Sequence, residues 1–274
     1  MCPEAHIAQL LAEAHGQGFG SINVDLMYGL PRQETGTFQR TVETVVSWRP
    51  SRVALFGYAH VPWMRPHQRL MGEHELPGPR ERVRLFATAA AVLEAAGYLH
   101  LGLDHFVLPT DELAVARIAG SLCRNFQGYS IRRATDLVGL GMSAIGRVAG
   151  TFLANHRKLR NYQSRASLGQ IPVERAYTPT RREDAIASAI EAVMCHGRLD
   201  LEAAGIEWGG HVGLFGSDVW DRLLPLQEDG VVERCGESIH LTPVGRFVAR
   251  HVAAALDPMI TTEDLTRERF SRGL

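Results

Sequence analysis

The first hundred residues alternate between apolar, β-branched runs and amphipathic helical segments, and this alternation restricts the fold more than any other feature. Two helical segments end in a glycine followed by an aromatic residue, at Gly18-Phe19 and Gly97-Tyr98. Glycine suits the position just past a helix C-terminus, and a strand-like run follows in both places. The expected strands are 19–28, 53–56 and 98–103, and the expected helices are 4–17, 35–49 and 79–96. This alternation predicts a parallel sheet with helices packed outside it.

Three parallel strands are too few to close a barrel, so they predict either an open sheet or the final part of a barrel. Polar residues at the points where the apolar runs stop favour the barrel; they are Asp25, His60, Asp104 and His105. Barrel enzymes place their sites at the C-terminal ends of the strands. We therefore expect these side chains to gather at one edge of the sheet.

Residues 123–146 combine cationic, amide, aromatic and small side chains at high density. The run Cys123-Arg124-Asn125-Phe126-Gln127-Gly128-Tyr129-Ser130 offers hydrogen bonds and ring stacking to a flat polar ligand. Four glycines follow, which allow close approach of the backbone to another group; they are Gly139, Gly141, Gly146 and Gly150. The stretch is predicted to be a loop that either packs tightly or binds a ligand.

Beyond Pro179 the pattern changes to helices with one short hairpin. Thr180 and Glu183 have the spacing of a capping box, so a helix is expected to begin near Arg182. The later order of helix, hairpin and helix predicts a winged-helix-like unit. Such units often bind DNA, but residues 183–258 contain no lysine, and their acidic residues match or exceed the basic ones. Duplex binding depends on phosphate neutralisation, so a packing or substrate-covering role is favoured.

Charge and cysteine usage exclude several classes of protein. The net charge of −1 and the pI near 6.9 give no long-range field for nucleic acid or anionic lipid. No uncharged apolar run reaches the roughly 18 residues needed to span a bilayer, and no secretion signal opens the chain, so a cytoplasmic protein is expected. An iron–sulfur cluster needs cysteines grouped in a short loop. The cysteines at 2, 123, 195 and 235 are widely separated, and no metal site is expected.

Four separated motifs, taken together, resemble one enzyme family. They are Asn23-Val24-Asp25-Leu26-Met27-Tyr28-Gly29-Leu30-Pro31, Tyr58-Ala59-His60-Val61-Pro62, Asp104-His105-Phe106 and the run from Cys123 to Gly146. In this order, and over essentially the whole length, the chain resembles the oxygen-independent coproporphyrinogen III oxidases, which are radical S-adenosylmethionine (SAM) enzymes of haem synthesis. The resemblance covers the C-terminal part of that family's chain. The family's cluster motif, C-x-x-x-C-x-x-C, is absent here.

The resemblance implies a fold and a division into three parts. The implied fold class is α/β, with the C-terminal part of a partial (β/α)6 radical-SAM barrel followed by a mostly helical, winged-helix-like domain. Residues 1–110 would form the last three β/α units of the barrel. Residues 111–178 would form a segment that covers substrate and cofactor, and residues 179–274 the helical C-terminal domain.

The resemblance also implies roles for individual residues. Asp25 and Ala59 match positions that contact a second SAM molecule, Ala59 through its backbone, and Ile145 matches a position near the SAM bound at the cluster. Contacts with the tetrapyrrole substrate are implied for His60, His105, Arg124, Asn125, Gln127 and Tyr129. From the residues alone, a salt bridge to an arginine is an equal alternative for Asp25. Burial in a core is the commoner fate of a lone histidine.

The implied reaction is oxidative decarboxylation of two propionates of coproporphyrinogen III to vinyl groups, giving protoporphyrinogen IX. It would use two SAM molecules, a 4Fe-4S cluster that this chain does not ligate, and an electron donor such as flavodoxin or ferredoxin. The expected partner is a missing N-terminal half that carries the cluster. Neither nucleic acid nor a membrane is expected as a partner. The fragment alone is expected to be inactive.

Two alternatives from non-catalytic classes stay open. One is a haem chaperone related to the radical SAM enzymes, and the other is a remnant that only binds SAM or a tetrapyrrole. Such chaperones carry a histidine–asparagine pair followed by tyrosine and tryptophan in the corresponding loop. This chain has Arg124-Asn125-Phe126 there, with no histidine ligand, which favours the oxidase.

Overall fold

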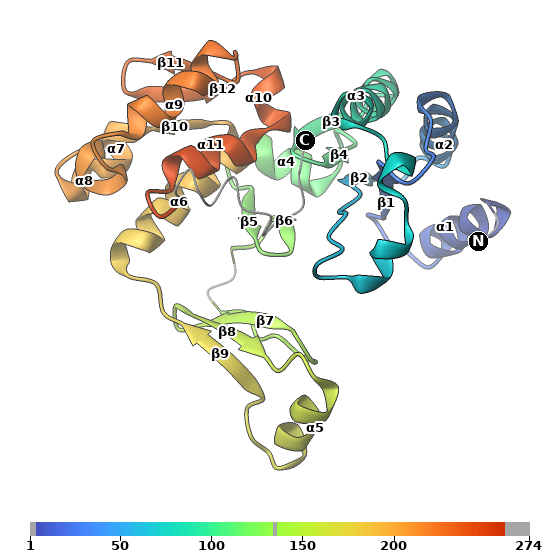
Figure 1. Ribbon diagram of the computed structural model, residues 1–274, viewed down its shortest axis with the longest axis horizontal. Coiled ribbons are helices and arrows are strands. Elements are labelled where there is room, and N and C mark those ends of the chain that lie inside the picture. The colour runs from blue at the N-terminus through green and yellow to red at the C-terminus, as the bar shows by residue number, and fades with distance from the viewer. Residues whose placement is uncertain (1–3, 134–135, 261–274) are drawn as a thin grey trace.

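The computed structural model describes residues 4–133 and 136–260. Figure 1 shows three parts in chain order: a sheet with its helices, a small β lobe, and a mostly helical part at the other end of the molecule. The elements of the first part are α1 (Glu4–Gly16), β1 (Asn23–Tyr28), α2 (Thr35–Ser47), β2 (Arg52–Gly57), η1 (Pro66–Leu70), η2 (Glu73–Glu75), α3 (Pro79–Ala95), β3 (Leu99–Gly102), β4 (His105–Val107) and α4 (Glu112–Ile118).

The sheet of the first part is mixed, with the strand order β1-β2-β4-β3. β1 and β2 are parallel, as predicted, but β4 pairs antiparallel with both β2 and β3. The predicted strand 98–103 is observed as β3 and runs in the same direction as β1 and β2, but the prediction of a wholly parallel sheet is wrong because β4, which was not predicted, lies antiparallel between β2 and β3. The chain reverses after Gly102, where Leu103 has a φ of 53°, and this tight turn inserts β4 beside β2. The apolar pattern did not reveal the turn because apolar residues continue on both sides of it.

One face of the sheet is covered by α2 and α3. Along β1, exposed residues alternate with partly or fully buried ones, as expected for a strand with one packed face. The packed face forms a core with both helices, whose members include Tyr28, Phe38, Val42, Val53, Leu55, Leu85, Ala89, Leu93 and Phe106. The opposite face keeps exposed side chains from β1 and β2. We call it the open face; its residues are Asn23, Asp25, Met27, Phe56 and His105.

His100 lies between two aromatic rings where β3 meets the helical part. Its imidazole stacks on Phe247 at 4.1 Å between ring centroids and lies 4.8 Å from the centroid of Phe106. One ring nitrogen, Nε2, is 3.0 Å from the carbonyl oxygen of Leu103. Burial of the ring lowers the pKa of His100 to about 4, so the imidazole is neutral at physiological pH.

This burial predicts a specific acid sensitivity. An unfolded histidine titrates near pH 6.5, so between pH 6.5 and about pH 4 the unfolded state binds a proton that the folded state does not bind. The free energy of unfolding is therefore unaffected by His100 above pH 6.5, and it decreases by about 2–3 kcal/mol as the pH falls toward 4. His100→Gln keeps a donor but cannot titrate. Urea unfolding at pH 7 and about pH 4.5 should show a smaller pH effect in this variant, and an equal effect would contradict the assignment.

The middle of the chain forms a hairpin and a separate lobe. The hairpin consists of β5 (Cys123–Asn125) and β6 (Gly128–Ser130), and the lobe contains β7 (Ile145–Val148), β8 (Thr151–Asn155), α5 (Leu159–Ser167) and β9 (Val173–Tyr177). The strands of the lobe form an antiparallel sheet in the order β7-β8-β9. Figure 1 shows the lobe standing apart from the first sheet. An ion pair of 2.7 Å between Arg147 and Asp184 connects it to the helical part.

The last part contains α6 (Arg181–His196), β10 (Arg198–Asp200), α7 (Leu201–Gly205), η3 (Ile206–Trp208), α8 (His211–Phe215), α9 (Val219–Glu228), β11 (Val232–Cys235), β12 (Ser238–Leu241), α10 (Pro243–Phe247) and α11 (Ala249–Leu256). The predicted capping box of Thr180 and Glu183 is confirmed, and α6 begins at Arg181, one residue earlier than expected. Strands β10, β12 and β11 form a small antiparallel sheet. Within the described ranges, no helix is long and apolar enough to cross a membrane.

Candidate functional site

The predicted ligand-binding loop at 123–130 is a β-hairpin. Asn125 pairs with Gly128 across the hairpin, and Phe126 and Gln127 form its tip. The side chain of Asn125 accepts a hydrogen bond of 2.8 Å from the backbone N–H of Gln127. Asn125 therefore shapes the turn, and both predicted amide contacts are exposed at the tip. The hairpin turn forms here because Gly128 has a φ of 133°. This conformation favours glycine and lets the chain continue as the second strand.

Two hydrogen bonds anchor this hairpin to α6. The hydroxyl of Tyr129 donates to the carbonyl oxygen of Met194 at 3.1 Å, and the backbone N–H of Arg124 donates to Glu191 at 2.8 Å. Burial raises the pKa of Tyr129 to about 12, so this hydroxyl remains a donor. Gly102 is required beside it, because a Cβ there would lie 2.5 Å from the hydroxyl oxygen. Tyr129 therefore fixes where the hairpin meets the sheet.

The anchored hairpin brings Arg124 and Tyr129 against His105 of β4. The guanidinium carbon of Arg124 lies 4.8 Å from the centroid of the Tyr129 ring, and the His105 ring meets Tyr129 edge-on at 5.3 Å. His105 Nδ1 is 2.7 Å from Asp104 Oδ1. Burial would raise the pKa of Asp104, but the hydrogen bond and charge of His105, with the charge of Arg124, lower it below its usual range. Arg124 Nη1 is buried, and no acceptor in the described part of the chain reaches it.

Asp25 lies on the same face of the sheet as His105. Asp25 is opposite Ala54 in β2, and Ala54 is opposite His105 in β4. Directly opposed residues point to the same face, so about 10 Å, two strand spacings, separates the two backbones. Asp25 is exposed and accepts a hydrogen bond of 2.6 Å from Asn23. It lies in the middle of β1 rather than at its end, and no ion pair to an arginine is found for it between residues 4 and 260 as described.

Ala59 and His60 lie in the connection that follows β2. The buried side chain of Gln68 holds this connection: it donates to the carbonyl oxygen of Ala59 at 3.0 Å and accepts from the N–H of Val61 at 2.6 Å. Ala59 itself stays exposed. His60 Nδ1 is buried and makes no hydrogen bond within the described structure. His105 begins β4 opposite Ala54 of β2, and His60 follows the C-terminal end of β2; no contact between the two histidines is found among the described residues.

Gln68 predicts a stability effect that is independent of any ligand. Gln68→Ala removes the side-chain partners of the half-buried N–H of Val61 and of the carbonyl oxygen of Ala59, and a buried group left without its partner costs about 1–3 kcal/mol. We expect urea denaturation to report a loss of at least about 1 kcal/mol. Gln39→Ala, which removes only an exposed contact with Glu43, is the matched control and should change little. Equal stabilities of both variants would mean that Gln68 does not hold the connection.

Ile145 is not brought to the open face. It begins β7, pairs with Ala154 of β8, and is partly exposed. Figure 1 shows β7 in the lobe, away from β1 and β2. Sequence patterns gave no signal for this separation, because the residues before β7 are small and apolar like those of a packed loop. Ile145 therefore lies apart from Asp25 and Ala59, and its contact with the SAM bound at the cluster stays a prediction.

The cysteines in the described part of the chain do not form a cluster site. Cys123 and Cys195 are buried, whereas Cys235 is exposed on β11. Burial raises the pKa of Cys195 to about 12, and metal ligation requires a thiolate. The thiol of Cys123 donates a hydrogen bond of 3.1 Å to the carbonyl oxygen of Ser130. Cys2 lies outside the described residues. These thiols do not fit a 4Fe-4S cluster.

Three residues near the site were not predicted. Met27 and Phe56, 45% and 38% exposed, lie on the open face. The alternation of polar and apolar residues in Asn23-Val24-Asp25-Leu26 was the sequence signal that could have placed Met27 there. Glu191 accepts the Arg124 N–H and also pairs with Arg133 at 2.9 Å. It comes from α6, and no local pattern links it to the hairpin.

Comparisons with known proteins give a consistent result. No protein-family model matches the chain. An oxygen-independent coproporphyrinogen III oxidase from Synechocystis sp. is 32% identical over 99% of this chain, and one from Salmonella typhimurium is 35% identical over 98%. The chain spans 59% of the length of each. A solved structure, described as the coproporphyrinogen III oxidase of Escherichia coli and a radical SAM enzyme, matches with a TM-score of 0.87 and 33% identity, over 94% of this chain and 59% of that one.

Proposed function

We propose, because this chain is homologous over nearly its whole length to oxygen-independent coproporphyrinogen III oxidases, that it forms the substrate-binding part of such an enzyme. The reaction would be the oxidative decarboxylation of two propionates of coproporphyrinogen III to vinyl groups. In this proposal the mixed sheet belongs to a partial (β/α)6 barrel whose interior is the open face. The part after Pro179 is a winged-helix-like unit that carries the hairpin anchor. The rest of the enzyme and an electron donor such as flavodoxin or ferredoxin would be partners.

One observation carries the substrate assignment: beside the open face, Arg124 Nη1 is buried and no acceptor among the described residues reaches it. A buried N–H group without an acceptor is costly, and a carboxylate is the best acceptor for a guanidinium because two parallel hydrogen bonds can form. Coproporphyrinogen III carries four propionates. We infer that one of them binds Arg124. Tyr129 would hold the guanidinium in place through the ring beneath it.

His105 would provide a second contact for the substrate. The ionised Asp104 accepts a hydrogen bond from His105 Nδ1, which favours a proton on that nitrogen. Nε2 is then the ring atom that faces the hairpin, 3.8 Å from where a Cβ of Gly128 would lie. The absence of a side chain at Gly128 leaves space there. In the imidazolium form His105 would donate to a second propionate, and in the neutral form it would accept a hydrogen bond.

The open face has features that suit SAM. Asp25 Oδ1 binds Asn23, and no hydrogen bond to the other oxygen is found in the described ranges, so that oxygen can accept from ribose hydroxyls. Met27 and Phe56 add exposed apolar surface on the same face for the adenine ring. We propose that these residues and the backbone of Ala59 bind the second SAM molecule. A SAM molecule that receives one electron from the electron donor would supply the radical that removes a hydrogen atom from the propionate. The described cysteines do not fit the cluster, which the rest of the enzyme would hold.

A binding measurement tests the role of Asp25. Asp25→Asn keeps the shape of the side chain but removes its charge, and a hydrogen bond to a charged group contributes about 1.5–3 kcal/mol. We expect equilibrium dialysis with labelled SAM to show binding weakened by at least tenfold. Asp221→Asn, an exposed change on α9, is the control and should bind as the wild type does. If Asp25→Asn binds SAM as tightly as the control, Asp25 is not part of the site.

A further inference from the structure

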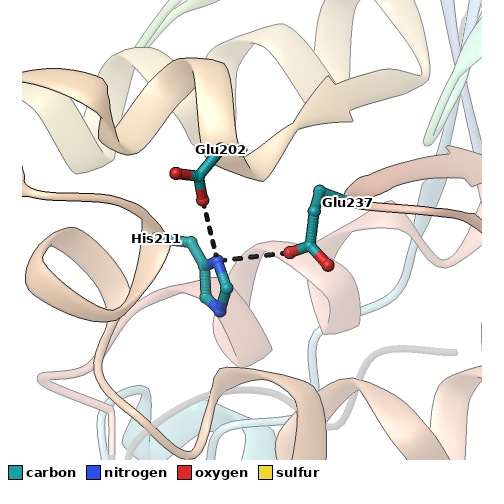
Figure 2. Close-up of side chains that lie close together, drawn as sticks. All are labelled: Glu202, His211 and Glu237. Carbon is teal, nitrogen blue, oxygen red and sulfur yellow. Dashed lines mark hydrogen bonds and ion pairs between the residues drawn. The ribbon is translucent and has the colours of Figure 1, made fainter.

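A second group of metal-binding side chains lies in the helical part, away from the open face. Figure 2 shows Glu202 of α7, His211 at the start of α8 and Glu237 in the turn between β11 and β12. One potential ligand atom from each residue lies within 4.8 Å of the other two. Both carboxylates approach the same ring nitrogen: Glu202 Oε2 and Glu237 Oε2 are each 3.2 Å from His211 Nδ1.

Hydrogen bonding alone does not satisfy this arrangement. The ring nitrogen carries at most one hydrogen, and a hydrogen bond is formed with Glu202. Glu237 Oε2 is buried at the atomic level, and no hydrogen-bond donor in the described structure reaches it. A buried carboxylate oxygen without a donor is costly, and the second carboxylate nearby increases the repulsion. A cation at the point where the three atoms converge would remove both costs.

Arg234 and Trp220 contact Glu237 and His211 on the side away from the point where the ligand atoms converge. The second oxygen of Glu237 pairs with Arg234 at 3.2 Å, and the Arg234 guanidinium stacks on Trp220 at 3.6 Å. The His211 ring meets the same Trp220 edge-on at 6.0 Å and is only 19% exposed. Outer contacts of this kind orient metal ligands and strengthen metal sites. Glu237 therefore presents one oxygen to His211 while the other is already occupied.

We propose that Glu202, His211 and Glu237 bind a divalent transition-metal ion of the zinc class. Zinc binds nitrogen and oxygen ligands at about 2.0–2.1 Å in tetrahedral geometry, which places neighbouring ligand atoms about 3.3 Å apart. Both ligand separations to His211 Nδ1 are 3.2 Å. An imidazole ligand favours zinc and its neighbours over magnesium or calcium. The ion would join α7, α8 and the β11–β12 hairpin, and water would complete its coordination.

A zinc titration of the full chain tests this site. The protein is first freed of metal with a chelator, and Cys235→Ser is used as the background because an exposed thiol on β11 also binds zinc. Competition with a chromophoric chelator should give one zinc ion per chain. Glu237→Gln and His211→Gln should each weaken binding by at least about tenfold, since loss of an outer contact alone has that effect. Glu233→Gln, an exposed change on the same hairpin, should not alter it.

Thermal unfolding provides a second readout. Zinc should raise the melting temperature of the Cys235→Ser background and of Glu233→Gln, but not that of Glu237→Gln. If His211→Gln does not fold, Glu202→Gln replaces it, because Glu202 is exposed and its change leaves the packing of α7 intact. The proposal is overturned if the background chain takes up no zinc. The three side chains would then form only ion pairs between His211 and the two carboxylates. It is equally overturned if Glu237→Gln binds zinc as tightly as the background.

Discussion

Mixing this chain with the part of a related oxidase that it does not match is expected to convert two inactive polypeptides into a catalyst of SAM cleavage. The chain alone should form no 5′-deoxyadenosine under dithionite, because the cysteines that the structure describes are buried or isolated. β1 pairs only with β2 within the described sheet, and its other edge offers backbone donors and acceptors to a further strand. A partner that adds strands at that edge and brings a cluster would place it beside the open face.

Chromatography of 5′-deoxyadenosine measures this effect, with the chain alone and the partner alone as controls. The Escherichia coli relative, of which the chain covers 59%, can supply the complementary part. Asp25→Ala should reduce the activity of the pair without separating its members, because Asp25 is exposed on the open face rather than packed in the core. If the two polypeptides associate and carry a full cluster but form no product, the catalytic interpretation of this chain is wrong.

The second large effect is expected from Arg124. In Arg124→Ala a propionate loses a charge-assisted contact, which contributes about 1.5–3 kcal/mol and corresponds to binding weakened by roughly 10- to 150-fold. Arg124→Lys should recover only part of it, because lysine cannot form the two parallel hydrogen bonds of a guanidinium. Fluorescence titration with coproporphyrin III measures the dissociation constant of each variant.

Arg124 also contacts the Tyr129 ring, so its stability must be checked separately. Urea unfolding of Arg124→Ala shows whether the hairpin remains anchored, which we expect because the anchor uses the Arg124 backbone and the Tyr129 hydroxyl. Arg132→Ala, an exposed arginine beyond β6, is the matched control for charge. A variant that stays folded and binds coproporphyrin III as tightly as this control would assign Arg124 a structural role only.

Proline, glycine and capping residues in the sequence predicted the ends of several helices correctly. The helix α3 begins at Pro79, as expected for a proline in the first turn, and the Thr180–Glu183 capping box sets the start of α6. The parallel pairing of β1 and β2 was also predictable from the helix between them. The element that was not predicted is β4, which lies antiparallel between β2 and β3. The two-residue reversal after Gly102 depends on backbone angles that an apolar run on both sides conceals.

The candidate site was predictable only in its parts. The motif residues Asp25, His105, Arg124 and Tyr129 do gather around one face, but this requires a sheet register and a hairpin anchored on α6. Contacts such as Arg124 to Glu191 join residues far apart in the chain, and no spacing rule reveals them. The position of Ile145 depends in the same way on distant contacts, since the lobe that carries it is defined by pairing between β7, β8 and β9.

Hydrogen–deuterium exchange of the assembled pair, with and without coproporphyrin III, tests whether the open face and the hairpin beside it bind the tetrapyrrole. We predict slower exchange with ligand at β1, at residues 104–105 and along the hairpin at 123–130, and no change at the Glu202, His211 and Glu237 group. Protection confined to the helical part or to the lobe, with β1 and the hairpin unchanged, would contradict it.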